Sequence, residues 1–233
     1  MAEGARSDRT TRTRLTRERV LRAAMTLADA DGIDRLSMRR LGRELGVEAM
    51  SLYNHVANKD DLLDGIVDFV LGEIYLPTPG EDWEEAMRKR AASARTVFSR
   101  HPWAIGLLEA RHADSSPMRL GYYDSVLGTL REAGFGPRPA MRAFSIIDSF
   151  LYGFILQEQS LAFDSPESLD EVGADLLRQM AEQYPHLTEA TRHAMESGYD
   201  FETEFEFGLD FIIEALERKL RDTAPAPHSA AGD

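Results

Sequence analysis

Cysteine is absent from the 233 residues of the chain. Its absence excludes disulfide bonds, thiolate metal sites and a cysteine nucleophile. Long apolar runs are missing as well, because none approaches the roughly 20 residues that span a bilayer. The Arg-rich N-terminal residues also lack the apolar core of a signal peptide. We therefore expect a soluble, cytoplasmic protein without a membrane partner.

The motifs of common enzyme classes are missing too. The sequence has no His-x-x-x-His pair, no Gly-rich phosphate loop and no Gly-x-Ser-x-Gly, although it contains six His and 40 Asp and Glu. No enzyme, cofactor or metal site is predicted. Segments with the two-residue period of a strand and internal repeats are also lacking, so we expect an all-α fold.

Charge is distributed unevenly along the chain. The net charge is −13, which by itself argues against a nucleic-acid partner. However, residues 1–60 carry 12 Lys and Arg against 9 Asp and Glu, a balance of +3, whereas residues 61–233 carry 15 against 31, a balance of −16. Because DNA responds to the local field of a patch, the N-terminal part can still bind it.

The stretch 36–60 predicts two short helices joined by a tight turn. Ser37 is placed to cap the first helix, because its hydroxyl can accept from a free backbone N–H of the first turn. Gly46 can adopt the left-handed conformation that ends a helix, and a second helix starts at Glu48. The side chains expected to point inward are Met38, Leu41, Leu45, Leu52 and Val56.

Two short helices with this turn predict a helix-turn-helix. In such a motif the second helix lies in the DNA major groove, and its first residues meet base edges. The residues expected to contact bases are Glu48, Ala49, Met50 and Ser51.

Two runs within residues 16–71 resemble the tetracycline-repressor (TetR) family: Gly46-Val47 followed by Leu52-Tyr53-Asn54-His55-Val56, and Asn58-Lys59-Asp60-Asp61-Leu62-Leu63. The resemblance implies an all-helical homodimeric repressor. It has an N-terminal DNA-binding domain and a larger C-terminal domain for an inducer and for dimerisation. The matching Tyr53, His55 and Lys59 would contact the DNA backbone, since all three can donate to phosphate oxygens.

Arg17 lies in the first turn of a helix expected from Thr16 to Asp31. A cation is disfavoured there by the helix dipole, which a phosphate partner would offset; a solvated side chain is the alternative. The full set of predicted DNA contacts is Arg17, Ser37, Arg39, Glu48, Ala49, Met50, Ser51, Tyr53, Asn54, His55 and Lys59.

Composition divides the chain into four parts. Residues 1–15 form a basic arm expected to be disordered, in which Arg12 or Arg14 either reaches DNA or stays solvated. Residues 16–75 form the helix-turn-helix DNA-binding domain with its connecting helix. The Pro-rich break at 76–80 precedes a ligand-binding and dimerisation domain over 81–222, and residues 223–233 form a disordered tail.

The second domain is expected to be helical throughout. The helices at about 139–163 and 199–221 have more apolar surface than one partner needs, so they are candidates for a four-helix dimer interface. The alternative is that both are core helices of a monomer. Further helices are expected at about 83–98, 103–111, 120–130, 168–183 and 187–196.

Aromatic and polar side chains of this domain suggest a ligand pocket, since such pockets are mostly apolar with a few convergent polar groups. The candidates are Met87, Phe98, Trp103, His112, Tyr122, Tyr123, Phe144, Ser149, Tyr152 and Gln157. Ordinary core packing is the alternative for each aromatic residue.

The segment 151–159 resembles the stretch of tetracycline repressors that supplies a carboxylate to a drug–magnesium complex. Gln157 stands where that carboxylate would be, although His112 can still match the metal-binding histidine. An amide is a poor substitute for an anion near a hard cation. Tetracycline is therefore not the inducer we expect.

The sequence thus predicts a homodimeric repressor that a small apolar or aromatic ligand releases from its operator. Ligand binding among the helices of 81–183 would shift the helix of 59–75 and change the separation of the two recognition helices. This requires different ligand affinity for the two arrangements. The alternative is a DNA-binding regulator without an inducer, acting as an activator or adaptor.

Overall fold

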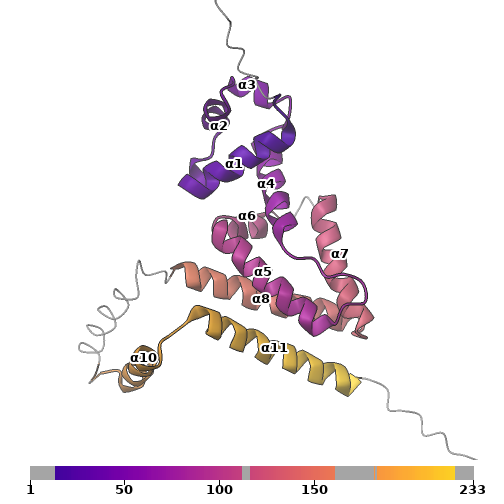
Figure 1. The fold of residues 1–233 in the computed structure, drawn as a ribbon, viewed down its shortest axis with the longest axis vertical. Helices are drawn as coiled ribbons and strands as arrows, with labels where there is room; N and C mark the ends of the chain where they lie inside the picture. The colour runs from indigo at the N-terminus through magenta and orange to yellow at the C-terminus, as the bar shows by residue number, and fades with distance from the viewer. Residues whose placement is uncertain (1–13, 112–115, 161–180, 182, 224–233) are drawn as a thin grey trace, which may run out of the picture. The chain divides into compact units, whose positions relative to one another are not determined.

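The computed structural model describes residues 14–111, 116–160, 181 and 183–223, and all regular secondary structure among them is helical (Figure 1). The predicted all-α fold is confirmed. The chain forms two compact units: residues 1–73 with 100–119, and residues 74–99 with 120–233. His112, the residues of the predicted arm before Arg14, nearly all of the predicted helix at 168–183 and the tail after Thr223 lie outside the described residues.

The first unit contains α1 (Arg17–Asp31), the 3-10 helix η1 (Ile33–Arg35), α2 (Met38–Leu45), α3 (Ala49–Leu52), α4 (Lys59–Glu73) and α6 (Ala104–Ala110). The predicted cap is present, since Ser37 Oγ accepts from Arg40 N at 3.3 Å. Thr16 caps α1 in the same way, because its side chain accepts from Arg19 N at 3.2 Å. Gly46 is left-handed, with φ of 67°. The buried core is Val20, Leu21, Ala24, Leu27, Leu36, Leu41, Leu52, Val56, Leu62 and Ile66.

The second helix of the helix-turn-helix is short. α3 ends at Leu52, and the chain then turns, with the backbone amides of His55 and Val56 donating to Leu52 O at 2.8 and 3.0 Å. Gly42 allows α2 to approach the start of α3, because an added Cβ would lie 2.9 Å from Val47 O and 3.1 Å from Ala49 N. The chain therefore needs a glycine here for contact between backbones.

Residues 100–119, which the sequence analysis assigned to the second domain, pack in the first unit. His101 Nδ1 lies 2.8 Å from Asp29 Oδ1, and Trp103 Nε1 donates to the same oxygen at 2.7 Å. At the other end, Arg111 Nε donates to Asp64 Oδ1 at 2.6 Å and Arg111 Nη1 to Asp60 Oδ1 at 3.1 Å. This segment thus binds both α1 and α4.

The second unit contains most of α5 (Trp83–Arg100) and α7 (Pro117–Glu132), together with α8 (Pro137–Ser160), α10 (Pro185–Ser197) and α11 (Phe201–Thr223). α8 and α11 lie side by side (Figure 1), and the Phe150 and Phe205 rings stack with centroids 5.6 Å apart. An added Cβ on Gly208 would come within 2.6 Å of the Phe150 ring, so glycine permits this close contact.

α8 is, within the described ranges, the one helix long and apolar enough by length and composition to cross a membrane. It also contains Asp148, which is buried and paired with Arg90 of α5. Its apolar side chains form part of the core of the second unit, including Ile147, Leu151 and Ile155.

Candidate nucleic-acid interface and buried polar cluster

The side chains predicted to contact bases lie at the surface of the first unit. Met50 is 75% exposed, an unusual position for a large apolar side chain, and Glu48 is exposed beside it. Ala49 and Ser51 are half-buried. The buried Leu52 and Val56 hold this segment on the core, so it presents its first residues outward.

The predicted phosphate donors follow directly in the chain. Tyr53, Asn54 and Lys59 are exposed, and His55 is half-buried. Ser37 and Arg39, at the start of α2, are exposed as well, although the Ser37 oxygen already caps the helix. All of these groups can donate to an anion, which is the chemistry that phosphate oxygens require.

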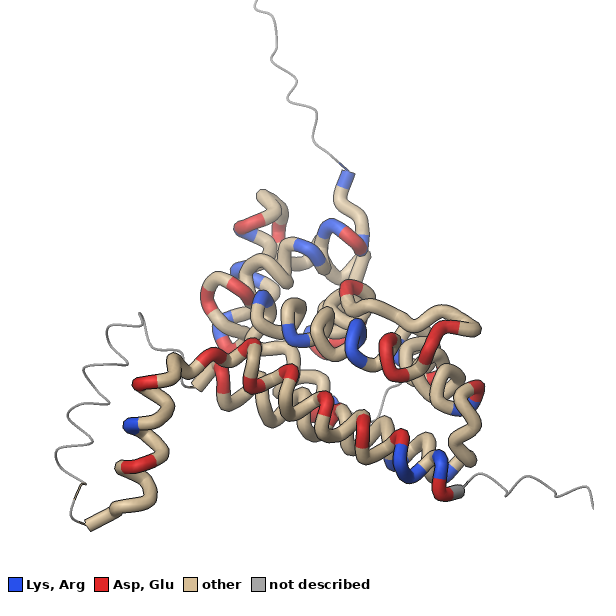
Figure 2. The backbone as a smooth tube through the Cα atoms, turned by 60° about the horizontal axis from the view of Figure 1, so that its bottom comes forward, with Lys and Arg blue, Asp and Glu red and all other residues tan. Residues whose placement is uncertain are grey.

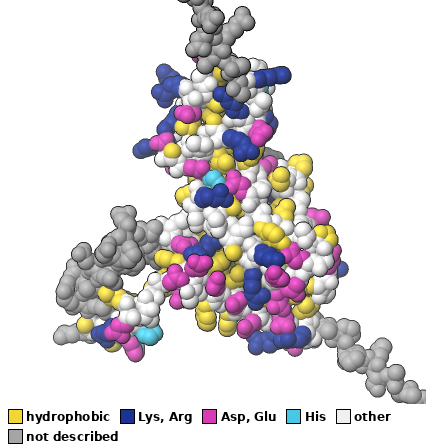
Figure 3. Space-filling view, in the orientation of Figure 1, with side chains coloured by type: hydrophobic (Ala, Val, Ile, Leu, Met, Phe, Trp, Pro, Cys, Tyr) yellow, Lys and Arg dark blue, Asp and Glu magenta, His cyan; other side chains and the backbone are white. Residues whose placement is uncertain are grey.

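Three more arginines lie beside the recognition helix: Arg14, for which DNA contact was one of two alternatives, and Arg19 and Arg43, which the sequence did not indicate. Arg14, Arg19 and Arg43 line a surface hollow of about 630 Å³, which Glu48 and Ser51 also line. Lys and Arg side chains are spread over the visible face of this unit (Figure 3). Their clustering depends on α1 meeting α2, so no local sequence pattern indicates it.

Arg17 is engaged within the protein. Its guanidinium forms two hydrogen bonds with the Asp61 carboxylate, at 2.9 and 2.6 Å, and a third with His55 O at 3.0 Å. The hydrogen bond from Arg17 holds the pKa of Asp61 below its ordinary value. The anion that offsets the unfavourable helix dipole at Arg17 is therefore Asp61 of α4.

The second unit contains a buried polar cluster made by Arg90, Tyr122, Asp148 and Tyr152. Arg90 Nη1 donates to Tyr122 Oη at 2.7 Å, and Arg90 Nη2 donates to Asp148 Oδ1. Arg90 Nε is buried and has no hydrogen-bond partner among the residues that the structure describes. Burial alone would lower the pKa of Arg90, but Tyr122 and Asp148 outweigh that effect and raise it. The guanidinium therefore stays charged.

Aromatic rings surround this cluster. The Arg90 guanidinium lies 5.8 Å from the Tyr122 ring centroid and 5.6 Å from that of Phe144. Edge-to-face contacts then join Tyr122 to Tyr123, Tyr123 to Phe144, and Phe98 to Tyr152. Burial raises the pKa of Tyr152 well above its ordinary value, with Asp148 adding to the effect, so its hydroxyl remains protonated.

The structure thus brings together five of the predicted ligand residues, and Met87 is buried in the same unit. Three other predicted ligand residues lie outside this cluster. Trp103 belongs to the first unit, bound to Asp29, while Ser149 and Gln157 are exposed on α8. Beside Gln157, Glu158 is paired with Arg95 at 2.6 Å.

Sequence reasoning missed Arg90 and Asp148. Arg90 interrupts the apolar stripe of Trp83, Met87 and Ala94, and Asp148 lies within the most apolar helix of the chain. A charge at a core position is a usable sign, because such groups are rarely buried unpaired. Within the described part of the chain no group of three His, Asp or Glu is placed to hold a metal ion.

An exposed recognition helix on a helix-turn-helix, combined with a separate helical unit, defines a DNA-binding protein of the two-domain regulator class. The family of bacterial regulatory proteins called the tetR family matches residues 20–66, and the tetracyclin repressor-like C-terminal domain matches residues 76–220. The chain belongs to the TetR family of transcriptional regulators, as the sequence predicted.

Named relatives cover nearly the whole chain. An HTH-type transcriptional regulator of Saccharopolyspora erythraea is 31% identical, over 87% of this chain and 84% of its own length. The class D tetracycline repressor protein of Escherichia coli is 32% identical, over 89% and 91%. Among solved structures, the Streptomyces coelicolor TetR family protein ActR in complex with actinorhodin has a TM-score of 0.74 at 28% identity, over 89% and 99%.

Proposed function

We propose that the protein is a homodimeric repressor that binds operator DNA through its first unit and is released by a small aromatic ligand bound in its second. The observation that carries the DNA-binding part is the exposure of Met50 at 75% on a helix whose other side is anchored in the core. Exposure of a large apolar side chain to water is unfavourable unless a partner covers it. The methyl group of thymine in the major groove can make such an apolar contact.

The proposed contacts divide into two groups. Glu48, Ala49, Met50 and Ser51 meet base edges and set the preferred sequence. The phosphate contacts come from Ser37, Arg39, Tyr53, Asn54, His55 and Lys59, with Arg14, Arg19 and Arg43 adding to the positive field. Acidic residues recur along α11 of the other unit (Figure 2), but DNA responds to the local field of the first unit.

The ligand site we propose is the aromatic cluster around Arg90. Arg90 Nε, which has no hydrogen-bond partner within the described part of the chain, can donate to an oxygen of the ligand. Tyr123, Phe144 and Tyr152 supply apolar contact. A planar aromatic compound with a carbonyl, phenolic or carboxylate oxygen satisfies both requirements. ActR, a TetR family protein of similar fold, has been solved in complex with actinorhodin and with (S)-DNPA, which supports a regulator that responds to a small molecule.

The path we propose from ligand to DNA is the segment 100–119. α5 ends at the first residue of this segment, and α7 begins within its last three residues. Both helices therefore connect the segment to the second unit along the chain. Arg111 binds Asp60 and Asp64 of α4, and Arg119 Nη2 lies 3.7 Å from Asp68. A ligand that favours another arrangement of this segment would shift α4, and with it the recognition helix.

The dimer interface we propose is made by α8 and α11. Phe207 and Phe211, one turn apart on α11, are 71% and 67% exposed, and Ile146 of α8 is also exposed. A second copy of the chain would cover these side chains in a symmetric four-helix contact. The double variant Phe207→Glu with Phe211→Glu should sediment as a monomer; a dimer of unchanged affinity would contradict this interface.

We further propose that the protein works in the cytoplasm and is not an enzyme. The named relatives are transcriptional regulators and repressors, which supports this role. Operator DNA is a cytoplasmic partner in bacteria, so location follows from the DNA-binding function.

Selection of bound oligonucleotides from a random pool, with the full-length protein, tests the DNA-binding part. A palindromic site with half-sites about 34–36 Å apart is expected for a dimer. Met50→Ala should then change the preferred bases, whereas Lys59→Ala should weaken all sequences alike and lower the salt slope by about one unit. Arg192→Ala, which removes an exposed cation of α10, serves as the control. Enrichment of no sequence would refute the proposal.

A second measurement tests the ligand part. Alizarin, a planar aromatic with carbonyl and phenolic oxygens, should raise the unfolding temperature of the protein and release the selected DNA. Anthracene, which has the same three rings without oxygens, is the matched control. If a broad panel of oxygenated aromatics leaves DNA binding unchanged, the alternative of a regulator without an inducer is favoured.

A further inference from the structure

Arg17 connects three parts of the first unit. It lies at the start of α1, yet its guanidinium binds Asp61 at the start of α4 through both terminal nitrogens, at 2.9 and 2.6 Å. Its Nη1 also donates to the carbonyl oxygen of His55 at 3.0 Å. Two parallel hydrogen bonds to a carboxylate fix the orientation of both side chains.

Asp61 continues this network along the chain. Its Oδ2 accepts from the backbone amide of Ala57 at 2.7 Å, and its own amide donates to Asn58 Oδ1 at 2.8 Å. The turn between α3 and α4 is therefore held at the His55 carbonyl, at the Ala57 amide and at the cap of α4. Each of these bonds depends on Asp61 or on the Arg17 that it orients.

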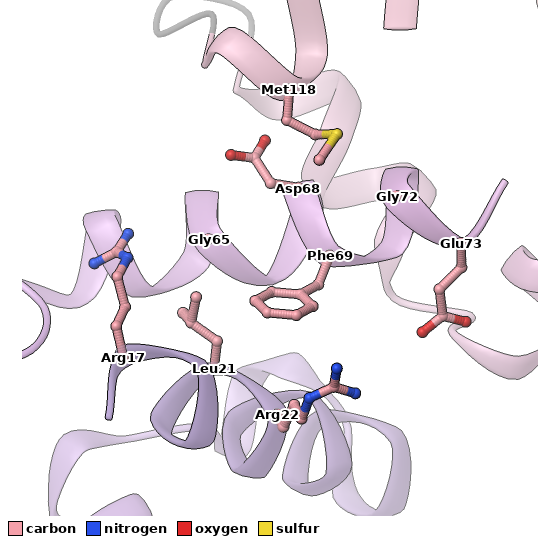
Figure 4. Close-up of a pocket in the computed structure, with 9 residues that line it drawn as sticks. All are labelled: Arg17, Leu21, Arg22, Gly65, Asp68, Phe69, Gly72, Glu73 and Met118. Carbon is pink, nitrogen blue, oxygen red and sulfur yellow. The ribbon is translucent and has the colours of Figure 1, made fainter. Parts of the chain in front are cut away.

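Gly65 allows the pair to form where it does. An added Cβ on Gly65 would lie 2.6 Å from Leu21 Cδ2 and 3.4 Å from Arg17 Nη2. Figure 4 shows Arg17 and Leu21 of α1 facing Gly65 of α4, at one end of a hollow of about 500 Å³. Without a side chain at position 65, α1 can approach α4 closely enough for the guanidinium to reach Asp61.

This turn contains the residues through which the protein would hold the DNA backbone. Tyr53 and His55 precede the Ala57 amide, and Lys59 follows it. We propose that Arg17 and Asp61 are positioning residues for DNA binding, which hold the turn 53–59 in the shape that phosphate contact requires and do not themselves contact DNA. The inference rests on the proposed DNA-binding function.

The alternative role for Arg17, a direct phosphate contact, makes the opposite prediction for Asp61. If Arg17 bound phosphate, Asp61 would compete with the DNA for it. Asp61→Asn would then free Arg17, remove a negative charge near the DNA and tighten binding. If the pair positions the turn, the same variant loosens the turn and weakens binding.

The experiment measures the affinity of the full-length protein for its selected operator by fluorescence anisotropy at several salt concentrations. Arg17→Gln and Asp61→Asn should each weaken binding about five-fold, with the salt slope unchanged. The exchanged variant, Arg17→Asp with Asp61→Arg, should recover part of the loss. Lys59→Ala is the reference for a phosphate contact, because it should lower the slope by about one unit.

Arg22→Gln is the matched control. Arg22 lies on the same helix in an exposed pair with Glu18, at 3.0 Å, so its loss should leave operator affinity unchanged. Hydrogen exchange supplies a readout independent of DNA: the Ala57 amide should exchange faster in Arg17→Gln and Asp61→Asn than in the parent protein. Thermal unfolding confirms that each variant is folded before its affinity is compared.

Two results would overturn the inference while leaving the proposed function intact. One is tighter operator binding by Asp61→Asn. The other is a fall in salt slope for Arg17→Gln that equals the fall for Lys59→Ala. Failure of the parent protein to select any DNA sequence is a different outcome, because it removes the proposed function itself and the positioning role with it.

Discussion

Each unit contains an arginine–aspartate pair that joins two of its helices: Arg17 with Asp61 in the first unit, where the pair is partly exposed, and Arg90 with Asp148 in the second, where it is buried. In the first unit, Arg17 and Asp61 are 46% and 30% exposed as side chains, and the pair formed by Arg111 and Asp64 is also in reach of water. In the second unit, Arg90 is fully buried and Asp148 is 10% exposed. Exposed pairs contribute about 0–1 kcal/mol, whereas removing one partner of a buried pair costs about 3–5 kcal/mol.

This difference indicates what each unit can do. Arg17 and Arg111 bind α4 in reach of water, so breaking either pair should cost the first unit little stability. The buried pair has no such alternative, because a lone charge among aromatic rings is strongly unfavourable. The second unit is thus suited to hold a fixed set of polar groups.

The largest effect expected is that of Asp148→Ala. It leaves the Arg90 charge buried without its carboxylate, so the free energy of unfolding should fall by about 3–5 kcal/mol in urea denaturation. The double variant Arg90→Met with Asp148→Leu removes both charges and should recover most of that loss. If the free energy of unfolding of Asp148→Ala lies within about 1 kcal/mol of the parent value, the buried pair is no stronger than an exposed one.

Asp29→Ala should have an intermediate effect. Its Oδ1 is the hydrogen-bond partner of both His101 and Trp103, and His101 is buried. Leaving these groups without a partner should lower the free energy of unfolding by about 1–3 kcal/mol. Asp34→Ala, an exposed position of η1, should change it by less than about 0.5 kcal/mol. Equal effects of the two variants would show that the segment 100–119 is not held through Asp29.

Glu81 gives a smaller effect that depends on pH. Hydrogen bonds from Tyr75, Lys89 and the Thr78 amide lower the pKa of Glu81 to about 2. A lowered folded-state pKa means that its stabilising contribution is complete above the ordinary glutamate pKa and is lost as pH falls toward 2. The difference in unfolding temperature between the parent and Glu81→Gln should therefore shrink between pH 6 and pH 3. A difference independent of pH would contradict this.

The smallest effect expected is that of Glu18→Gln. The exposed pair of Glu18 and Arg22 is a single-turn contact on α1. Its loss should change the free energy of unfolding by less than about 0.5 kcal/mol, and 0.5 M salt should remove even that difference. A loss comparable to that of Asp29→Ala would mean that exposure is a poor guide to the strength of these pairs.

The helix-turn-helix was predictable because its determinants are local. Ser37 caps α2 through a hydrogen bond to a residue three positions later, and the left-handed φ that ends α2 is a property of Gly46 alone. The inward positions of Leu41 and Leu52 follow from helical spacing. The boundaries of α8 and α11 were predicted within three residues for the same reason.

The pairing of charges was not predictable. Arg17 and Asp61 are 44 positions apart, and Arg90 and Asp148 are 58 apart. The dipole argument indicated that Arg17 needs an anion but could not identify which one, because the choice depends on how α1 packs against α4. The aromatic candidates likewise separated only in the folded chain, where Trp103 belongs to the first unit and Tyr122 to the second.

The placement of residues 100–119 affects how the protein can be dissected. Five carboxylates of α1 and α4, those of Asp29, Asp60, Asp64, Asp68 and Glu73, are bound by side chains from this later segment. A fragment that ends after α4 would keep every residue of the helix-turn-helix while losing the cations and donors opposite these acids. Such a fragment would be a poor substitute for the intact repressor, since part of its scaffold is encoded downstream of the linker.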